Sequence, residues 1–245
     1  MKSRIGAIAI AGVLAAACDP APLVIPFQDK PMQRLANNIY AEPGVTDADA
    51  RTLLAAHTTA AANVKDFFGA PRSGLPVAIF CGTAVCKVLF GAPPAAAASL
   101  DLGFSRDALV TKDGLIDTPV VVATGPVFNT ARILTHELVH AEMKSWVAYD
   151  ALPTWFNEGM ATWIANEPDC GSRPPVSRFD VRQLDTKEKW QAHIRTPGVT
   201  IRTYCEAREA ASQWAGQFPN HAAAGAATRL LLQVRIPRNP ITHSA

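Results

Sequence analysis

The chain has 245 residues, of which 49% are hydrophobic, so it can bury the core of one domain and is neither disordered nor fibrous in composition. Its formal net charge is +2, and two of the positive charges, Lys2 and Arg4, lie in a segment that we expect to be removed. The mature protein would then be close to neutral. Such a charge balance does not indicate binding to nucleic acid or electrostatic attachment to a membrane surface.

The first eighteen residues, MKSRIGAIAIAGVLAAAC, have the form of an export signal. Basic residues precede an apolar stretch from Ile5 to Ala17, which is too short to span a bilayer. The final LAAAC resembles the lipobox of bacterial lipoproteins, in which the cysteine, here Cys18, is lipidated after cleavage; Ala15 departs from the usual Leu. We therefore expect a lipoprotein-type signal peptide at 1–17 and a periplasm-facing protein held to the envelope membrane through Cys18. The alternative is cleavage near AAA, giving a soluble periplasmic or secreted protein.

The remaining cysteines indicate disulfide bonds. Without Cys18, the five cysteines become four, an even number that suits an oxidising compartment. The natural pairing joins Cys81 with Cys86 across CGTAVC, and Cys170 with Cys205 as a longer bridge, although four cysteines allow three pairings. A zinc site built from all four cysteines is the alternative, but the chain lacks the close CxxC pairs that such sites favour.

A short tether and a long helix are predicted next. The stretch from Asp19 to Pro31 is rich in proline and has no hydrophobic pattern, which predicts a tether at 18–31 and a folded domain at 32–245. The segment TDADARTLLAAHTTAAANVKDFFG begins with N-cap residues and stops at Gly69, so it predicts a long helix. His57 stands alone in that helix, and we expect it to be exposed.

Strand patterns follow the long helix. LPVAIF and VCKVLF flank CGTA and predict a β-hairpin closed by the first disulfide. TPVVVA, at 118–123, is a third short run rich in β-branched residues and predicts another strand. GAPPAAAASLDLG, between the second and third runs, is expected to be a loop.

The second half of the chain is predicted to be helical. NTARILTHELVHAEMKSWVAYD has Asn129 or Thr130 as its N-cap, and LPTWFNEGMATWIANEP begins near Pro153 and ends before Pro168. The polar, proline-containing region from Asp169 to Thr200 has no predicted element. Two further helices are predicted, at Arg202 to Gln217 and His221 to Val234.

The first of these helices contains the motif HELVH. His136 and His140 are four residues apart, so both imidazoles project from one helix face and can reach a single metal ion. Glu137 is rotated by about 100° from His136, which puts its carboxylate beside the metal, where a general base for water belongs. With six His and eight Glu in the chain, an HExxH match is expected by chance roughly 0.005 times.

A solvated helix would be the simpler explanation of this motif. However, the motif is surrounded by the apolar residues Ile133, Leu134, Leu138 and Val139, which favours a buried, metal-paired cluster. Glu142 lies outside the motif and receives no role beyond a supporting or surface carboxylate. A zinc site needs a third protein ligand and an open position. Glu158, within WFNEGMATW on the next helix, is the candidate.

HExxH on one helix completed by a Glu within NEG on the next resembles the gluzincin metallopeptidases. The resemblance covers about 120–166 closely and the order of the other elements more loosely. It implies a zincin-like α+β fold with a small mixed β-sheet, an active-site helix, a second metal-ligand helix and C-terminal helices. PVVVA would match the edge strand that holds the substrate in extended form. Metzincins are disfavoured, because no HxxGxxH follows Glu137.

On this resemblance His136, His140 and Glu158 match the zinc ligands and Glu137 the general base. Thermolysin-like members carry an Asp four residues after the third ligand, where this chain has Thr162, so the partner that orients the metal-bound His is not evident. Gluzincins also use a Tyr or His to stabilise the oxyanion. Tyr204 resembles that Tyr, and a Cys170 to Cys205 bond would restrain it; the weaker candidates are Tyr149 and His193.

The sequence thus predicts a zinc-dependent metallopeptidase that hydrolyses peptide bonds of a peptide or protein substrate through a metal-activated water, with Glu137 as general base. Two alternatives stay open. The first is a zinc amide hydrolase that acts on cell-wall peptides, and the second is a non-catalytic binding protein that retains the fold.

Overall fold

The computed structural model describes residues 26–27, 30–70, 76–90, 98–101, 110–111, 114–115, 120–124, 130–146, 152–167, 170 and 179–234. The predicted signal peptide, Cys18 and most of the predicted tether lie outside the described residues. Of the tether, the structure describes two short strands, β1 (Pro26–Phe27) and β2 (Lys30–Pro31), which pair antiparallel.

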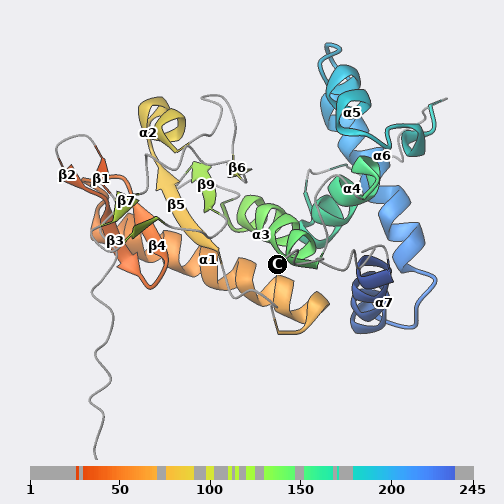
Figure 1. The fold of residues 1–245 in the computed structure, drawn as a ribbon, viewed down its shortest axis with the longest axis horizontal. Coiled ribbons are helices and arrows are strands. Elements are labelled where there is room, and N and C mark those ends of the chain that lie inside the picture. Colours follow the sequence, from red (N-terminus) through yellow and green to blue (C-terminus); the bar gives the residue numbers. More distant parts are fainter. Residues whose placement is uncertain are drawn as a thin grey trace, which may run out of the picture.

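The protein is an α+β protein with one small mixed sheet (Figure 1). The strand order is β3-β4-β5-β9-β6, with β4, β5 and β9 parallel and the outer strands β3 and β6 antiparallel to their neighbours. All five residues of β5 are buried, as expected of a central strand. The bounds are β3 Gln33–Ala36, β4 Ile39–Ala41, β5 Val77–Cys81, β6 Ala98–Asp101 and β9 Val120–Thr124, beside a separate pair, β7 Val110–Thr111 and β8 Gly114–Leu115.

The longer helices lie beneath this sheet or extend beyond it, and a short helix lies at the end of β5 (Figure 1). In Figure 1, α1 runs beneath both the sheet and the central helix α3, while α4, α6 and α7 lie on the far side of α3 from the sheet. The metal-motif helix therefore lies between the sheet and the C-terminal helices. The bounds are α1 Asp47–Phe68, α2 Ala84–Leu89, α3 Thr130–Trp146, α4 Thr154–Ala165, the 3₁₀ turn η3 Val181–Gln183, α5 Lys187–Ile194, α6 Thr200–Ala215 and α7 His221–Val234.

The long helix α1 confirms its sequence signals. The Thr46 hydroxyl accepts a hydrogen bond from the Asp49 backbone N–H at 3.1 Å, and Gly69 ends the helix with a positive φ of 77°. The prediction for His57 is wrong, because only 5% of that residue is exposed. His57 lies on the same face as Leu53, Ala60 and Val64, which packs into the core.

The predicted hairpin is also wrong, because the chain after β5 forms helix α2 instead of a second strand. The Thr83 hydroxyl caps this helix by accepting from Cys86 N, and one carboxylate oxygen of Glu42 accepts from the backbone N–H groups of Gly82 and Thr83, both at 2.8 Å. The Cys81–Cys86 disulfide is confirmed. Capping and this short covalent link outweigh the β propensity of VCKVLF.

The third predicted strand is confirmed as β9, but its expected place at the sheet edge is wrong. Strand β9 pairs with β5 on one side and β6 on the other. The edge strand is β6, which occupies part of the stretch expected to be a loop. An alanine-rich segment carries little strand signal, so its pairing depends on tertiary contacts that the sequence pattern does not reveal.

The C-terminal helices follow the predicted ranges, and the region from Asp169 to Thr200 contains two elements that the pattern missed, η3 and α5. They pack with α6 in a second small core, which contains Val181, Leu184, Trp190, Ala207 and Ala210. The Cys170–Cys205 disulfide, also confirmed, ties α6 to the chain that follows α4. Among the described residues, no helix has the length and apolar character needed to cross a membrane.

Candidate metal centre

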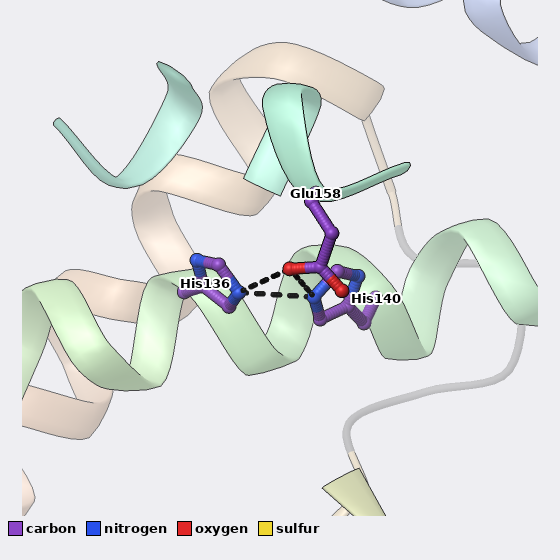
Figure 2. A group of neighbouring side chains, drawn as sticks. All are labelled: His136, His140 and Glu158. Atoms are coloured by element: carbon purple, nitrogen blue, oxygen red, sulfur yellow. Dashed lines mark hydrogen bonds and ion pairs between the residues drawn. The ribbon is translucent and has the colours of Figure 1, made fainter. Parts of the chain in front are cut away.

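The motif HELVH lies in the middle of α3, with its two histidines facing α4 (Figure 2). The apolar residues around it are buried, as the pattern predicted: Ile133, Leu134, Leu138 and Val139. Glu158 projects from the first half of α4 toward both imidazoles (Figure 2). Two residues of α3 and one of α4 therefore meet at one point between the helices.

The donor atoms of these three residues converge. Nε2 of His136 and Nε2 of His140 are 3.0 Å apart, and Oε2 of Glu158 lies 3.5 Å from the first and 3.6 Å from the second (Figure 2). The side chains are mostly buried, with 14%, 5% and 12% of His136, His140 and Glu158 exposed. Grouped in this way, His136, His140 and Glu158 could hold a metal ion.

The size of this triangle can be compared with that of a metal site. In a tetrahedral zinc site with bonds of 2.0–2.1 Å, neighbouring ligand atoms are roughly 3.3 Å apart. The observed separations of 3.0, 3.5 and 3.6 Å lie on both sides of that value. The three donor atoms thus fit one face of such a tetrahedron, and two imidazoles with one carboxylate are a donor set that zinc accepts.

His140 is oriented by a residue that the sequence analysis did not single out. Its Nδ1 lies 3.0 Å from Oδ1 of Asn157, and both side chains are buried. An amide oxygen can only accept, so Nδ1 carries a hydrogen, and Nε2 is the ring atom that faces Glu158 and could bind a metal. Thr162 has no such role: its hydroxyl donates to the carbonyls of Glu158 and Gly159 within α4.

Without a metal, the cluster is held together by charge. Burial alone would lower the pKa of His140, but the Glu158 carboxylate, the Glu137 charge and the Asn157 hydrogen bond together outweigh burial and raise the pKa to about 9. Burial alone would raise the pKa of Glu158, but the two imidazoles lower it well below its ordinary value. A proton on His140 and a negative charge on Glu158 therefore stabilise the metal-free cluster as an ion pair, and a metal cation would replace that proton.

Glu137 lies beside His136, His140 and Glu158 and is not part of that group. Its negative charge helps to raise the pKa of His140 and of Tyr204, which places its carboxylate next to the cluster. The side chain is only partly buried, and among the described residues its carboxylate makes no hydrogen bond or ion pair. A carboxylate in this position is free to accept a proton from water at the site.

Tyr204 is brought to the same site by α6. Its ring centroid lies 6.3 Å from that of His136, and its other side packs edge-to-face on Trp190 at 5.2 Å. Burial, with added repulsion from Glu158 and Glu137, raises the pKa of Tyr204, so the phenol keeps its hydrogen and can donate it. Of the weaker candidates, His193 stacks on Phe179, and Tyr149 lies outside the described residues.

The glycine of NEG sets the distance between α4 and α6. A Cβ on Gly159 would lie 2.4 Å from the backbone oxygen of Ala207, which is closer than real Cβ atoms approach. Ala207 follows Tyr204 by less than one turn of α6. Gly159 therefore allows α4 and α6 to approach closely, and this contact puts Tyr204 beside Glu158, which directly precedes Gly159.

Two further glutamates lie on α3 and shortly after α4. Glu142 is buried and accepts a hydrogen bond from the Trp146 indole at 2.8 Å, which indicates a structural role. Glu167 follows α4; one of its carboxylate oxygens is buried with no hydrogen-bond partner among the described residues. The pKa of Glu167 is raised, chiefly by burial. The His136 imidazole lowers this pKa, and the negative charge of Glu137 raises it further. The sequence gives no pattern from which this proximity could be predicted.

No protein-family model matches the chain, and no curated protein matches it with significant similarity. The convergence of His136, His140 and Glu158, with Glu137, Asn157 and Tyr204 around them, is therefore what characterises the site.

Proposed function

We propose that the protein is a zinc-dependent metallopeptidase of the gluzincin type, with a zincin-like fold. The observation that carries this proposal is the convergence of the three donor atoms at 3.0–3.6 Å, with the Glu137 carboxylate left outside them. Ligands and a separate base are the two parts that metal-assisted hydrolysis requires. The order HExxH, then NEG on the next helix, supports the same assignment.

The proposed zinc ligands, and the residue that orients one of them, belong to α3 and α4. Nε2 of His136, Nε2 of His140 and Oε2 of Glu158 would hold the ion, which leaves one position of a tetrahedron open. Asn157 keeps His140 in the tautomer that presents Nε2. When bound, zinc supplies Lewis acidity and lowers the pKa of water at that position toward about 7.

The proton transfers are assigned to Glu137. Its carboxylate accepts the proton of the attacking water and then donates it to the nitrogen of the departing amine, so one group serves as base and then acid. Tyr204 keeps its phenolic hydrogen because its pKa is raised by burial and by Glu158. That O–H can donate to the negative oxygen that develops on the substrate carbonyl.

The edge strand β6 is the proposed place for the peptide substrate. Among the described strands β6 pairs only with β9, and α3 packs against both. An extended peptide could add to the free edge of β6 by backbone hydrogen bonds. Strand β9, which the sequence suggested for this role, pairs with a strand on each side and has no edge left for a peptide.

The location of the protein is proposed from the sequence, with support from the disulfides. The N-terminal signal and Cys18 imply a lipid-anchored protein of the bacterial envelope that faces the periplasm. Two disulfides among the other four cysteines fit an oxidising compartment. Mass spectrometry of the native N-terminus tests this proposal: an unmodified chain that begins elsewhere than Cys18 would contradict it.

Cleavage of a mixed peptide library by wild type and by Glu137→Gln tests the proposed reaction. The variant keeps the size of the side chain and one acceptor oxygen but cannot accept the proton. We expect hydrolysis to fall by about 10²- to 10⁴-fold while zinc stays bound. Equal hydrolysis by both proteins would overturn the peptidase assignment.

The same assay with cell-wall peptides as further substrates, together with the zinc content, separates the two alternatives. Cleavage of cell-wall peptides in place of the library would identify a zinc amide hydrolase on this scaffold. Stoichiometric zinc without hydrolysis of either substrate would identify a binding protein.

A further inference from the structure

A cavity lies away from the proposed metal centre, between residues of α1, α4 and α7. Its volume is about 240 Å³. The last turns of α1 and α4 and the first residue of α7 line it, through Asn63, Asp66, Phe67, Trp163, Ile164 and His221. None of the proposed zinc ligands is among them.

The cavity and the metal centre are on different faces of α4. Trp163 is five residues after Glu158, which is a rotation of about 140° around the helix. The two sites are nevertheless linked by a hydrogen bond, because Asn63 Nδ2 donates to the hydroxyl of Thr135 at 3.2 Å. Thr135 directly precedes His136 on α3.

The walls of the cavity are aromatic. The rings of Phe67 and Trp163 meet edge-to-face with centroids 5.5 Å apart, and Trp163 meets the His221 ring in the same manner at 5.1 Å. Phe67 is buried, so its position is fixed by the core. A fixed group of aromatic rings offers the π faces that attract a cation or pack against an alkyl chain.

Two residues that line the cavity favour a positive charge. Asp66 carries a carboxylate with no ion pair among the described residues, and Asn63 donates through Nδ2, which leaves its Oδ1 as an acceptor. Asp66 and Phe67 also belong to the last turn of α1, where the helix dipole favours a positive charge.

Two positive features also lie nearby, a guanidinium and the N-terminus of α7. The Arg229 guanidinium lies at the C-cap of α1, where a Cβ on Gly69 would be 3.4 Å from Nη1, and it does not line the cavity. The α7 N-terminus is already capped, because Asn220 Oδ1 accepts from Ala223 N at 2.9 Å.

We propose that this cavity binds an alkylammonium group, with the rings of Trp163 and Phe67 against its alkyl part and the Asp66 carboxylate as counter-ion. A volume of about 240 Å³ is below the roughly 300–1,000 Å³ of a drug-sized site, so it suits a single headgroup. Either a lysine side chain of a peptide or a free small amine carries this group. The site involves no metal, so its test is independent of the proposed peptidase function.

Titration of n-butylammonium chloride at constant ionic strength tests the site. The protein is labelled with ¹⁵N-tryptophan, and the Trp163 indole signal is assigned by its loss in Trp163→Phe. We expect a saturable shift of this signal with a millimolar Kd, and no saturation with the neutral analogue 1-butanol. A Trp163 signal that does not move, or that responds equally to both compounds, overturns the proposal.

Asp66→Asn provides the variant and Asp47→Asn the matched control. Both residues are exposed on α1 and both changes remove one negative charge, but Asp47 lies at the opposite end of the helix. We expect the Kd for n-butylammonium to rise by at least about threefold in Asp66→Asn and to stay unchanged in Asp47→Asn. The same Kd in both variants would overturn the role of the carboxylate.

Two further probes distinguish the sources of the group. Nα-acetyl-lysine methylamide represents a peptide lysine and choline a free amine. Tighter binding of the first identifies a peptide as the source, tighter binding of the second identifies a small amine, and saturation by neither overturns the proposal.

Discussion

The centres of α3 and α1 each bury a histidine, and the two sites differ in what surrounds the ring. His140 on α3 is 4% exposed and His57 on α1 is 5% exposed. His140 has Asn157 on one ring nitrogen and Glu158 near the other, and its pKa is raised to about 9. Nε2 of His57 has no partner among the described residues, and burial lowers its pKa.

This difference separates a binding site from a packing position. An unpartnered buried imidazole stays neutral and fills space at a cost in stability. An imidazole held by an amide and a carboxylate keeps a defined tautomer and a defined direction, which is what a metal ligand needs. Although the two histidines are equally buried, their replacement should therefore have different consequences for metal binding.

The largest expected difference is in zinc affinity. His140→Phe, which fills the same buried space, should weaken zinc binding by at least about 100-fold, because one of three ligands is lost. His57→Leu should leave zinc affinity unchanged. Competition with a chromophoric chelator measures both, and circular dichroism checks that both variants fold. Similar affinities for the two variants would remove the distinction between the sites.

Asn157→Leu tests the support of His140. We expect zinc affinity to fall by about 10- to 100-fold, because the imidazole loses the acceptor that fixes its tautomer. Thr162→Val is the matched control on the same helix, since the Thr162 hydroxyl bonds only to carbonyls of α4 among the described residues. If Thr162→Val were the more damaging change, the orienting role of Asn157 would be wrong.

Gly159→Ala tests the close contact that brings Tyr204 to the site. A Cβ 2.4 Å from the Ala207 oxygen should force α6 away and lower the free energy of unfolding by about 1–3 kcal/mol. Gly216→Ala is the control, since Gly216 has a φ of −64° and its Cβ would be 3.3 Å from the Ser212 oxygen. Urea unfolding of both variants measures the effect, which is contradicted if their midpoints agree.

The smallest expected effect is the pH dependence due to His57. Because folding lowers its pKa below the ordinary value of 6.5, its neutral form stabilises the fold above pH 6.5, and that stability is lost as pH falls through the folded pKa. The loss has a slope of at most about 1.4 kcal/mol per pH unit. Unfolding of His57→Leu between pH 7 and 4 should show a shallower decline than wild type. Parallel declines would show that His57 does not titrate on unfolding.

In the metal-free protein His140 should act in the opposite direction. Folding raises its pKa from 6.5 to about 9, so its contribution is complete below pH 6.5 and is lost as pH rises through about 9.

The sequence predicted the parts of the site that depend on helical spacing. His136 and His140 lie on one face because they are four residues apart, and caps such as Thr46 and Gly69 are local signals. Glu158 was found through the NEG pattern, and the structure brings it to both imidazoles.

Contacts between distant segments could not be predicted in the same way. Asn157 orients His140, and Glu167 approaches His136, because of the way in which α4 packs against α3. The sequence pattern does not reveal this packing. His57 was expected to be exposed because it stands alone in the long helix, but the buried face of α1 is determined by the elements packed on it. The error at α2 has the same origin, since Glu42 and a disulfide override a strand-like pattern.

The most direct test of the proposed metal centre is the zinc content of the purified protein, measured with its zinc-edge X-ray absorption spectrum. We expect one zinc ion per chain and a ligand shell of nitrogen and oxygen at about 2.0–2.1 Å, with the scattering pattern of two imidazoles. Zinc well below one equivalent, or sulfur among the ligands, would contradict a site formed by His136, His140 and Glu158.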